Sequence, residues 1–302
     1  MHKSLDLIIP VYNSHDALVK ALASVAVNDI DFKLKVYIVN DGSSKGYSEE
    51  AEIFKDLLDI TIFDLDVNRG VGYARKYGLE HSDGDYVAFL DADDLIYDFK
   101  SLQTLYDLID SKNYDYAYGA IIQEAYGIGE VVEEHNGCLH GKIYRREYLN
   151  KKNITFNPTR TSEDYSFNHL CVFGTYNFAA IDEVVYIYKD NKKSLTKGID
   201  LTKTIDNLVD FVDNIIYVMD HVENRFSKNV ISFFLDAYFY VFKNYEYYKN
   251  QGEEERMITL LQKLEDKGKI YDEETISKVA PAFSFITVSY THLRAHETDS
   301  YL

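Results

Sequence analysis

The pattern of apolar and polar positions divides residues 1–115 into short apolar runs that alternate with amphipathic stretches. The apolar runs predict strands at residues 5–12, 34–40, 60–66, 85–92 and 114–121, and the amphipathic stretches predict helices at 13–27, 47–58, 70–82 and 100–112. Because the runs are apolar on both faces, they predict an α/β fold with a mostly parallel, doubly wound sheet flanked by helices. In such sheets, ligands bind outside the carboxyl ends of the strands.

The pattern becomes less regular after this half and then turns purely helical. A helix is expected near residues 161–170 and a strand at 179–189, and beyond residue 200 apolar residues recur at helical spacing. The expected organisation is a domain over 1–200, with a nucleotide-sugar-binding half at 1–115 and an acceptor half at 116–200, a small helical region at 201–280, and a tail at 281–302. The tail resembles translated adapter sequence, so we expect it to be non-native.

Composition narrows the classes of protein. The 302 residues are 46% hydrophobic, which suffices for a globular core, and no uninterrupted apolar run approaches the ~20 residues of a membrane span. A net charge of −18 argues against general binding to nucleic-acid backbones. Two cysteines form neither a metal spacing nor a disulfide framework. We therefore expect a cytoplasmic protein, with contact at the inner face of the membrane left open.

Three carboxylates follow directly behind one of the predicted buried strands. In "FLDADD", Asp91, Asp93 and Asp94 succeed the apolar run 86–90. Like charges at one point usually persist where a cation or hydrogen-bond donors offset their repulsion. Asp41 ends another predicted parallel strand, so it should lie at the same edge of the sheet. A bound metal is the first hypothesis, and a solvated acidic turn is the alternative.

Several motifs occur in a fixed order along the chain. "IIPVYN" (8–13), "VNDGSS" (39–44), "NRGVGYARKYG" (68–78) and "GDYVAFLDADD" (84–94) are followed by "HGKIYRREYL", "SEDYSF" and "YKDNKKS". Arg75 occupies the third glycine position of a dinucleotide fingerprint, which excludes that reading of the G-x-G. Together the motifs resemble family-two glycosyltransferases with the GT-A fold, and the resemblance implies a transferase that uses a nucleotide sugar.

The resemblance implies a divalent metal, Mn²⁺ or Mg²⁺, at the acidic motif. Asp93 would bind this metal directly, Asp91 would contact the metal or the ribose, and Asp94 would orient the loop. Such a metal neutralises the diphosphate that leaves as the glycosidic bond breaks. Many relatives carry a histidine in the closing loop, where this chain has Asn191 with lysines nearby. That departure weakens the expectation of metal dependence.

The same resemblance assigns the donor pocket. Pro10, Val11 and Tyr12 would line the base pocket, with Tyr12 stacking on uracil, and Asp41 would accept a hydrogen bond from the base. Arg75 would reach the base or a diphosphate oxygen. Plain structural explanations stand beside these roles: Pro10 could end a strand, Tyr12 could belong to the core, Asp41 could cap the turn "NDGSS", and Arg75 could form a surface salt bridge.

The catalytic candidate lies in "SEDYSF". An inverting transfer needs one base to take the proton of the acceptor hydroxyl. The resemblance assigns that role to Asp164, with Glu163 and, more weakly, Lys142 binding the acceptor. Helix capping by Ser162 or Asp164 is the structural alternative.

The sequence thus predicts an inverting, metal-dependent glycosyltransferase whose donor is a nucleotide sugar, with a UDP-sugar favoured, and whose acceptor is a glycan or another hydroxyl-bearing molecule of unknown identity. Two other classes stay open: a nucleotidyltransferase, although its glycine-rich loop after the first strand is missing, and a catalytically silent protein that binds nucleotide sugars. The oligomeric state is not indicated.

Overall fold

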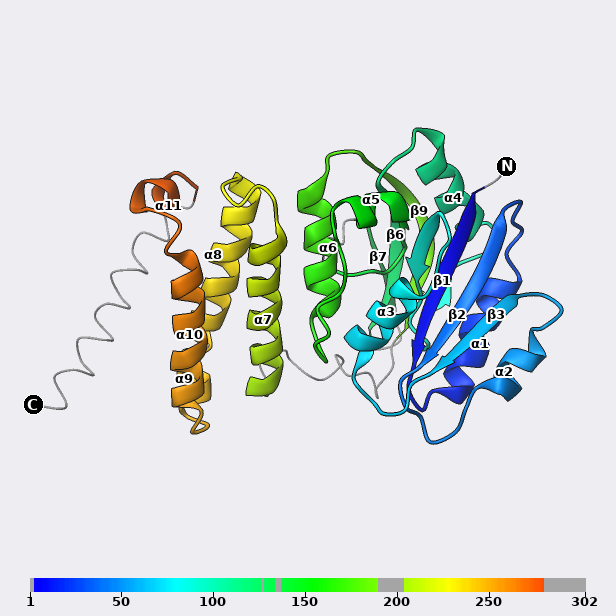
Figure 1. Ribbon diagram of the computed structural model, residues 1–302, viewed down its shortest axis with the longest axis horizontal. Helices are drawn as coiled ribbons and strands as arrows, with labels where there is room; N and C mark the ends of the chain where they lie inside the picture. The colour runs from blue at the N-terminus through cyan, green and yellow to red at the C-terminus, as the bar shows by residue number, and fades with distance from the viewer. Residues whose placement is uncertain (1–2, 126–127, 134–136, 190–203, 280–302) are drawn as a thin grey trace, which may run out of the picture. The chain divides into compact units, whose positions relative to one another are not determined.

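The computed structural model describes residues 3–125, 128–133, 137–189 and 204–279 (Figure 1). The chain forms two units, Met1–Leu201 and Thr202–Leu302. The first holds the sheet and all of the predicted site residues that the structure describes, and the second is helical.

The first unit is built on one mixed sheet with strand order β3-β2-β1-β4-β8-β6-β9-β5, and β7 pairs with β6. The strands are β1 (Ser4–Val11), β2 (Lys33–Asn40), β3 (Asp59–Asp64), β4 (Tyr86–Phe89), β5 (Leu95–Ile96), β6 (Tyr116–Ala125), β7 (Ile128–Val132), β8 (Lys142–Arg145) and β9 (Phe178–Tyr188). The pairs of β1 with β2, β2 with β3, β1 with β4 and β6 with β9 are parallel. The predicted α/β class is confirmed. The short strands β5, β7 and β8, each with an antiparallel partner, were not expected.

Strand β8 is inserted antiparallel between β4 and β6. Its register pairs Ala88 with Ile143 and Tyr86 with Arg145. The residues just before β8 therefore lie beside those just after β4. This places the start of "HGKIYRREYL" at the acidic edge of the sheet.

Helices cover both faces of the sheet (Figure 1). They are α1 (His15–Ala26), α2 (Ser48–Ile53), α3 (Val71–Glu80), α4 (Ser101–Ser111), α5 (Arg146–Lys151) and α6 (Glu163–Gly174). Because successive strand residues point to opposite faces, Leu5, Leu7 and Ile9 of β1 share one core with α1 and α4. Ile8 points the other way and meets α3 at Gly78. Helix α3 thus lies directly on the central strands.

The second unit contains α7 (Ile205–His221), α8 (Lys228–Lys243), α9 (Tyr245–Lys249), α10 (Glu254–Gly268) and α11 (Glu273–Val279). Hydroxyl side chains cap two of these helices. Thr204 accepts a hydrogen bond from the backbone N–H of Asn207, and Ser227 accepts one from the backbone N–H of Val230. Helices α7 and α10 run parallel and are joined by three ion pairs: Arg256 with Asp206, Lys263 with Asp213, and Lys267 with Asp220. Among the described residues, no helix combines the length and apolarity needed to cross a membrane.

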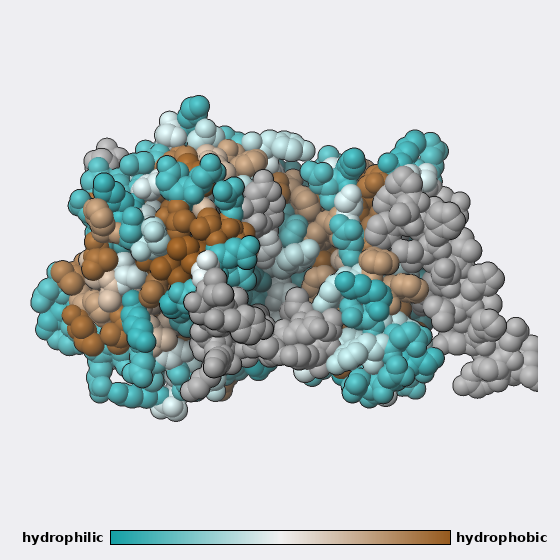
Figure 2. Space-filling view, turned by 180° about the vertical axis from the view of Figure 1, so that it is seen from behind, coloured by the Kyte–Doolittle hydropathy of each residue, from teal (hydrophilic) through white to brown (hydrophobic). Residues whose placement is uncertain are grey.

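The surface of the first unit carries apolar side chains on the side seen in Figure 2. Exposed large apolar residues of this unit include Val27, Tyr97 and Phe99. Val27 and Phe99 belong to neighbouring segments, because the backbone N–H of Asp29 donates to the carbonyl of Phe99 at 2.8 Å.

The close approach of α3 to the sheet generates a stability prediction. A Cβ added at Gly78 would lie 2.6 Å from Ile8 Cγ2 and 3.1 Å from Val39 Cγ2. We expect Gly78→Ala to lower the free energy of unfolding by about 1–3 kcal/mol, because the helix must move away from the strands. Gly46→Ala is the matched control, since a Cβ there meets nothing within 4 Å. Urea unfolding measures both, and equal stability of the two variants would contradict the close packing of α3.

Candidate active site

Asp41 and Asp91 follow the parallel strands β2 and β4 and lie at the carboxyl edge of the sheet, as the sequence predicts. The carboxylate of Asp41 is 3% exposed and accepts hydrogen bonds from the backbone N–H groups of Arg69 and Gly70, each at 2.8 Å. Asp41 therefore fixes the loop that leads into α3. The "NDGSS" turn is capped by Asn40 instead, whose Oδ1 accepts from Ser43 N at 2.9 Å.

A three-residue cluster forms behind β4. Nε2 of His140 lies 3.5 Å from Asp91 Oδ2 and 3.7 Å from Asp94 Oδ2. The buried carboxylate of Asp94 also accepts from the hydroxyl of Tyr186 at 2.7 Å and from the backbone N–H of Lys189 at 2.8 Å. Asp94 is thus held by both the imidazole and the end of β9.

Burial and charge shift the titration of this cluster. Burial, together with the charge of Asp91, raises the pKa of Asp94 to about 7. Burial also acts to raise the pKa of Asp91, but the opposing charges of Arg75 and His140 hold it well below its usual range. Burial works against a charge on His140, yet the hydrogen bond to Asp91 raises its pKa well above the ordinary value. Asp91 therefore favours the charged form of His140, which also faces Asp94.

His140 is a site residue that the sequence interpretation missed. It stands at the head of "HGKIYRREYL", and the antiparallel pairing of β8 with β4 brings it next to Asp91. Its ring stacks on Tyr186 and Tyr188, with centroids 5.0 and 4.7 Å apart. A prediction of the antiparallel pairing would have been enough to find it.

The cluster fits a divalent metal ion. One ligand atom from each of Asp91, Asp94 and His140 lies within 4.8 Å of the other two. Two carboxylates and a neutral imidazole suit Mn²⁺ well, so His140 would release its proton on binding the ion. Asp93, half-buried on the same turn, is not part of this group, so its direct role at the metal stays a prediction. Asn191 lies outside the described residues.

Arg75 projects from α3 and joins two carboxylates that come from different parts of the chain. Its Nη2 donates to Asp91 Oδ1 and its Nη1 donates to Glu163 Oε1. The side chains of Arg75 and Glu163 are only 6% and 3% exposed, so this is a buried ion pair and not a surface salt bridge. Burial would lower the pKa of Arg75, but the charges of Asp91 and Glu163 raise it.

Helix α6 begins at Glu163 and carries Asp164 in its first turn. Ser162 precedes it with φ 63°, in the left-handed region, and makes no side-chain capping bond. Asp164 Oδ1 accepts from the N–H of Tyr165 at 2.8 Å, a bond to the next residue that differs from a regular N-cap. Burial raises the pKa of Glu163 to about 8 against the charge of Arg75, and it also raises the pKa of Asp164.

The remaining predicted residues fall into two groups. Pro10 and Val11 are buried in β1, whereas Tyr12 is 50% exposed just beyond the strand, so Tyr12 is not a core residue. Lys142 is 2% exposed and donates from Nζ to the carbonyl of Cys138 at 2.8 Å, and burial lowers its pKa to about 8. Its Nζ also donates to Oδ1 of Asn168, in α6, at 3.4 Å.

Comparison with known proteins agrees with this geometry. The family model described as glycosyl transferase family 2 matches residues 6–174. The chain belongs to that family. The glycosyl transferase family 2 match contains the acidic motif, Arg75, His140 and Asp164.

Curated relatives are considerably longer than the matching segment. The chain is 28% identical over 170 residues to glycosyltransferase GlyA of Streptococcus pneumoniae, covering 56% of this chain and 24% of that protein. It is 30% identical over 141 residues to an uncharacterized glycosyltransferase of Rickettsia felis, covering 46% of this chain and 23% of that protein. The chain thus spans about a quarter of the length of these two relatives.

Solved structures show the same GT-A fold. S. aureus TarS 1-349 in complex with UDP-GlcNAc is similar with a TM-score of 0.62 and 18% identity, covering 92% of this chain and 76% of that one. The mannosyltransferase PcManGT from Pyrobaculum calidifontis, in complex with GDP-Man and Mn²⁺, is similar with a TM-score of 0.59 and 15% identity, covering 96% of this chain and 80% of that one.

The cluster generates a prediction about metal binding. We expect His140→Ala to weaken Mn²⁺ binding in the presence of UDP by at least about 10-fold, because it removes a nitrogen ligand. Asp93→Ala tests the ligand that the sequence motif implies. His221→Ala, an exposed histidine of the second unit, is the control. Free Mn²⁺ is measured by electron paramagnetic resonance. If only Asp93→Ala weakens binding, the ligand set is that of the sequence motif and His140 is not part of it.

Proposed function

We propose that this chain is an inverting glycosyltransferase that moves a sugar from a nucleotide sugar, with a UDP-sugar favoured, to an acceptor hydroxyl. The observation that carries this proposal is the ion-pair chain from Asp91 through Arg75 to Glu163. It joins the acidic edge next to the donor motifs to the helix turn that presents Asp164. A donor site and a base are thereby held in one place, as a direct displacement requires.

The chemistry assigned to Asp164 follows from its position. An acceptor oxygen that attacks the anomeric carbon must lose its proton, and the bond from that carbon to the diphosphate oxygen breaks. Asp164 takes the proton. Its raised pKa means that the Asp164 carboxylate binds a proton more tightly than a free aspartate does. A divalent metal, which Asp91, Asp93, Asp94 and His140 would hold, supplies positive charge for the leaving diphosphate.

The choice of donor rests on the residues around β1 and β2. Tyr12 presents a half-exposed ring beside the carboxyl edge, which suits stacking on a base. Asp41 holds the Arg69–Gly70 loop and would complete the base pocket together with Pro10 and Val11. The UDP-GlcNAc complex of TarS supports a UDP-sugar, and the GDP-Man complex of PcManGT makes GDP-sugars the alternative to screen.

The acceptor is a glycan or another hydroxyl-bearing molecule in this proposal, and Glu163 and Lys142 stay the acceptor-side candidates, with Glu163 already paired to Arg75. We retain a cytoplasmic location as a proposal. A nucleotidyltransferase is not favoured by any observed feature. A silent nucleotide-sugar-binding protein differs from the proposed enzyme by one property, turnover.

Replacement of Asp164 tests the proposal. Asp164→Asn keeps the size of the side chain but cannot accept the acceptor proton, so we expect transfer and donor hydrolysis to fall by about 10²- to 10⁴-fold. UDP affinity and the unfolding midpoint should change little. Asp16→Asn is the matched control, because it also removes a carboxylate from the first turn of a helix.

The effect of Asp164→Asn is measured as the rate of hydrolysis of UDP- and GDP-sugars in Mn²⁺. The released nucleoside diphosphate is the product that is quantified. A variant with turnover within a few-fold of the wild type would remove Asp164 from the role of base and make Glu163 the next residue to test. A wild-type chain that binds UDP but turns over none of these sugars would support the silent binding protein.

The division of the chain yields a separate proposal, that residues 1–200 carry the chemistry and the helices of 201–280 place the acceptor or a partner. We expect a chain ending at Lys203 to fold and to bind UDP with unchanged affinity, while transfer to an acceptor is lost. Calorimetry with UDP measures the first property and sugar transfer the second. Unfolding of the shortened chain would instead mean that the two units depend on each other for stability.

A further inference from the structure

Both terminal nitrogens of the Arg75 guanidinium are engaged by protein carboxylates. One donates to Asp91 and the other to Glu163. The remaining nitrogen, Nε, is buried and has no hydrogen-bond partner among the described residues. Arg75 is 5% exposed, so little of its guanidinium is accessible to a bound nucleotide sugar. These contacts favour a structural role for Arg75 over the diphosphate or base contact that the sequence motif implies.

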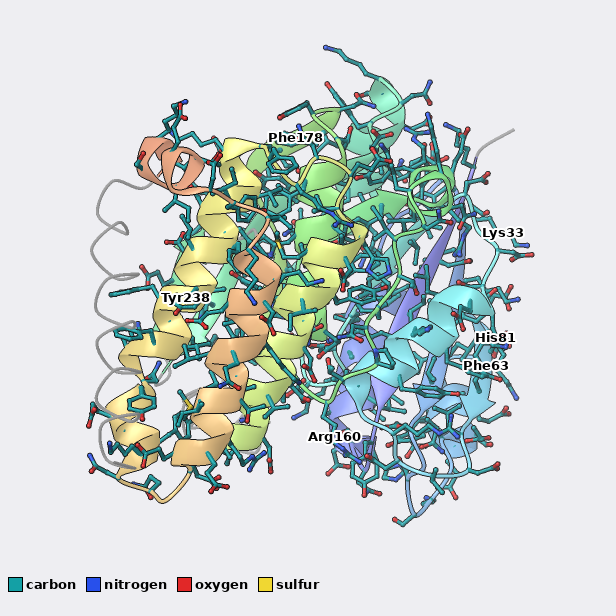
Figure 3. All side chains as sticks on the ribbon, turned by 60° about the vertical axis from the view of Figure 1, so that its left-hand side comes forward. Lys33, Phe63, His81, Arg160, Phe178 and Tyr238 are labelled. Atoms are coloured by element: carbon teal, nitrogen blue, oxygen red, sulfur yellow. The ribbon has the colours of Figure 1, made fainter. Side chains whose placement is uncertain are left out.

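The segment around Arg75 is packed against the segment that precedes Asp164. A Cβ at Gly72 would lie 2.5 Å from the carbonyl oxygen of Thr159 and 2.9 Å from Glu163 Cγ, so only glycine permits this approach. Arg160 Nη1 donates to Asn68 Oδ1 at 3.1 Å, and Figure 3 shows Arg160 beside the start of α3. The first turn of α3 thus serves as a platform for residues 159–163.

The loop that leads into this first turn of α3 is itself held by Asp41, which follows β2. Asp41 holds the backbone of Arg69 and Gly70 immediately before α3. The connection runs from Asp41 to the loop, along α3 to Arg75, and through Glu163 to the turn that carries Asp164. Asp91 closes the connection, because it shares Arg75 with Glu163.

We propose that Arg75 is a positioning residue, which through Glu163 sets the first turn of α6 and thereby places Asp164 relative to the donor bound at Asp91. This inference rests on the proposed function of Asp164 as the base. Arginine is needed because its planar fork has two terminal nitrogens that can address two carboxylates at once, whereas a lysine offers a single point charge. A positioning residue acts on kcat, whereas a residue that binds the substrate directly acts on KM and on Kd.

The test compares Arg75→Lys with the wild type in hydrolysis of UDP-GlcNAc, or of whichever UDP- or GDP-sugar the wild type hydrolyses, in Mn²⁺. We expect kcat to fall by about 10- to 100-fold, because a misplaced base costs rate even when the substrate still binds. KM for the donor and Kd for UDP should stay within about 3-fold. A Kd for UDP weakened 10-fold or more at unchanged kcat would overturn the proposal and restore a donor contact.

The control for loss of a buried arginine is Arg146→Lys. Arg146 pairs with the buried Asp6 at 3.0 Å and donates to the carbonyl of Gly84, at the opposite edge of the sheet. Its side chain is 13% exposed, and like Arg75 it forms an ion pair with a buried carboxylate, but it lacks the connection to Asp164. Its substitution should lower stability without a selective loss of kcat. An equal loss of kcat in both variants would show that Arg75 acts only through general stability, against the proposal.

A double-mutant cycle tests the route through Glu163. Glu163→Gln keeps the volume of the side chain and removes its charge, so it also serves if Arg75→Lys does not fold. We expect Glu163→Gln to lower kcat with Kd for UDP unchanged, and Arg75→Lys to reduce kcat by less than about 3-fold further in that background. Multiplicative effects of the two substitutions would overturn the proposed route. So would a Glu163→Gln variant with wild-type kcat.

Amide hydrogen exchange tests positioning without turnover. In Arg75→Lys, or in Glu163→Gln if the first does not fold, we expect faster exchange in the first turn of α6, at Tyr165 and Ser166, and in Arg146→Lys no change there. Unchanged exchange in that turn would overturn the proposal. A wild-type chain that hydrolyses none of the sugars would contradict the proposed function, and this exchange result would then decide the role of Arg75 separately.

Discussion

The acidic edge of the sheet depends on one buried cation. Five carboxylates, those of Asp41, Asp91, Asp94, Glu163 and Asp164, come from two strand ends and one helix, and several are removed from water. Carboxylates in such surroundings become protonated, or are stabilised by partners. Asp41 uses backbone N–H groups, Asp94 uses a tyrosine and a backbone N–H, and Arg75 serves Asp91 and Glu163 together.

The balance of charge at this edge also explains its chemistry. One arginine and one histidine face a larger number of acidic groups here, and burial together with this excess of negative charge raises the pKa values of Asp94 and Glu163. A nucleoside diphosphate would add further negative charge. A cation at the Asp91, Asp94 and His140 group would offset that charge.

The sequence predicted the elements that have a distinct local pattern of apolar residues and missed those that are recognised only by their pairing. Strands β1 to β4 stand out because their apolar runs are uniform, but β8 is four residues long and is recognised only by its pairing with β4 and β6. For the same reason His140 could not be placed beside Asp91. Apolar residues recur through 230–248, but the structure divides this stretch at Asn244, whose side chain donates to the carbonyl of Tyr240 at 2.7 Å and competes with the backbone. Motif order indicated Arg75, but not that its two partners lie 16 and 88 residues away.

The attachment of Asp94 to the end of β9 has a consequence for synthesis of the chain. Its partners, Tyr186 and Lys189, follow it by 92 and 95 residues. At ribosomal rates of about 5–20 residues per second, the nascent chain carries these acidic residues without their partners for on the order of 10 s. Parallel pairing of β6 with β9 adds the loop-closure entropy of a long-range contact. Asp94 therefore emerges from the ribosome well before the groups that hold its carboxylate in the folded chain.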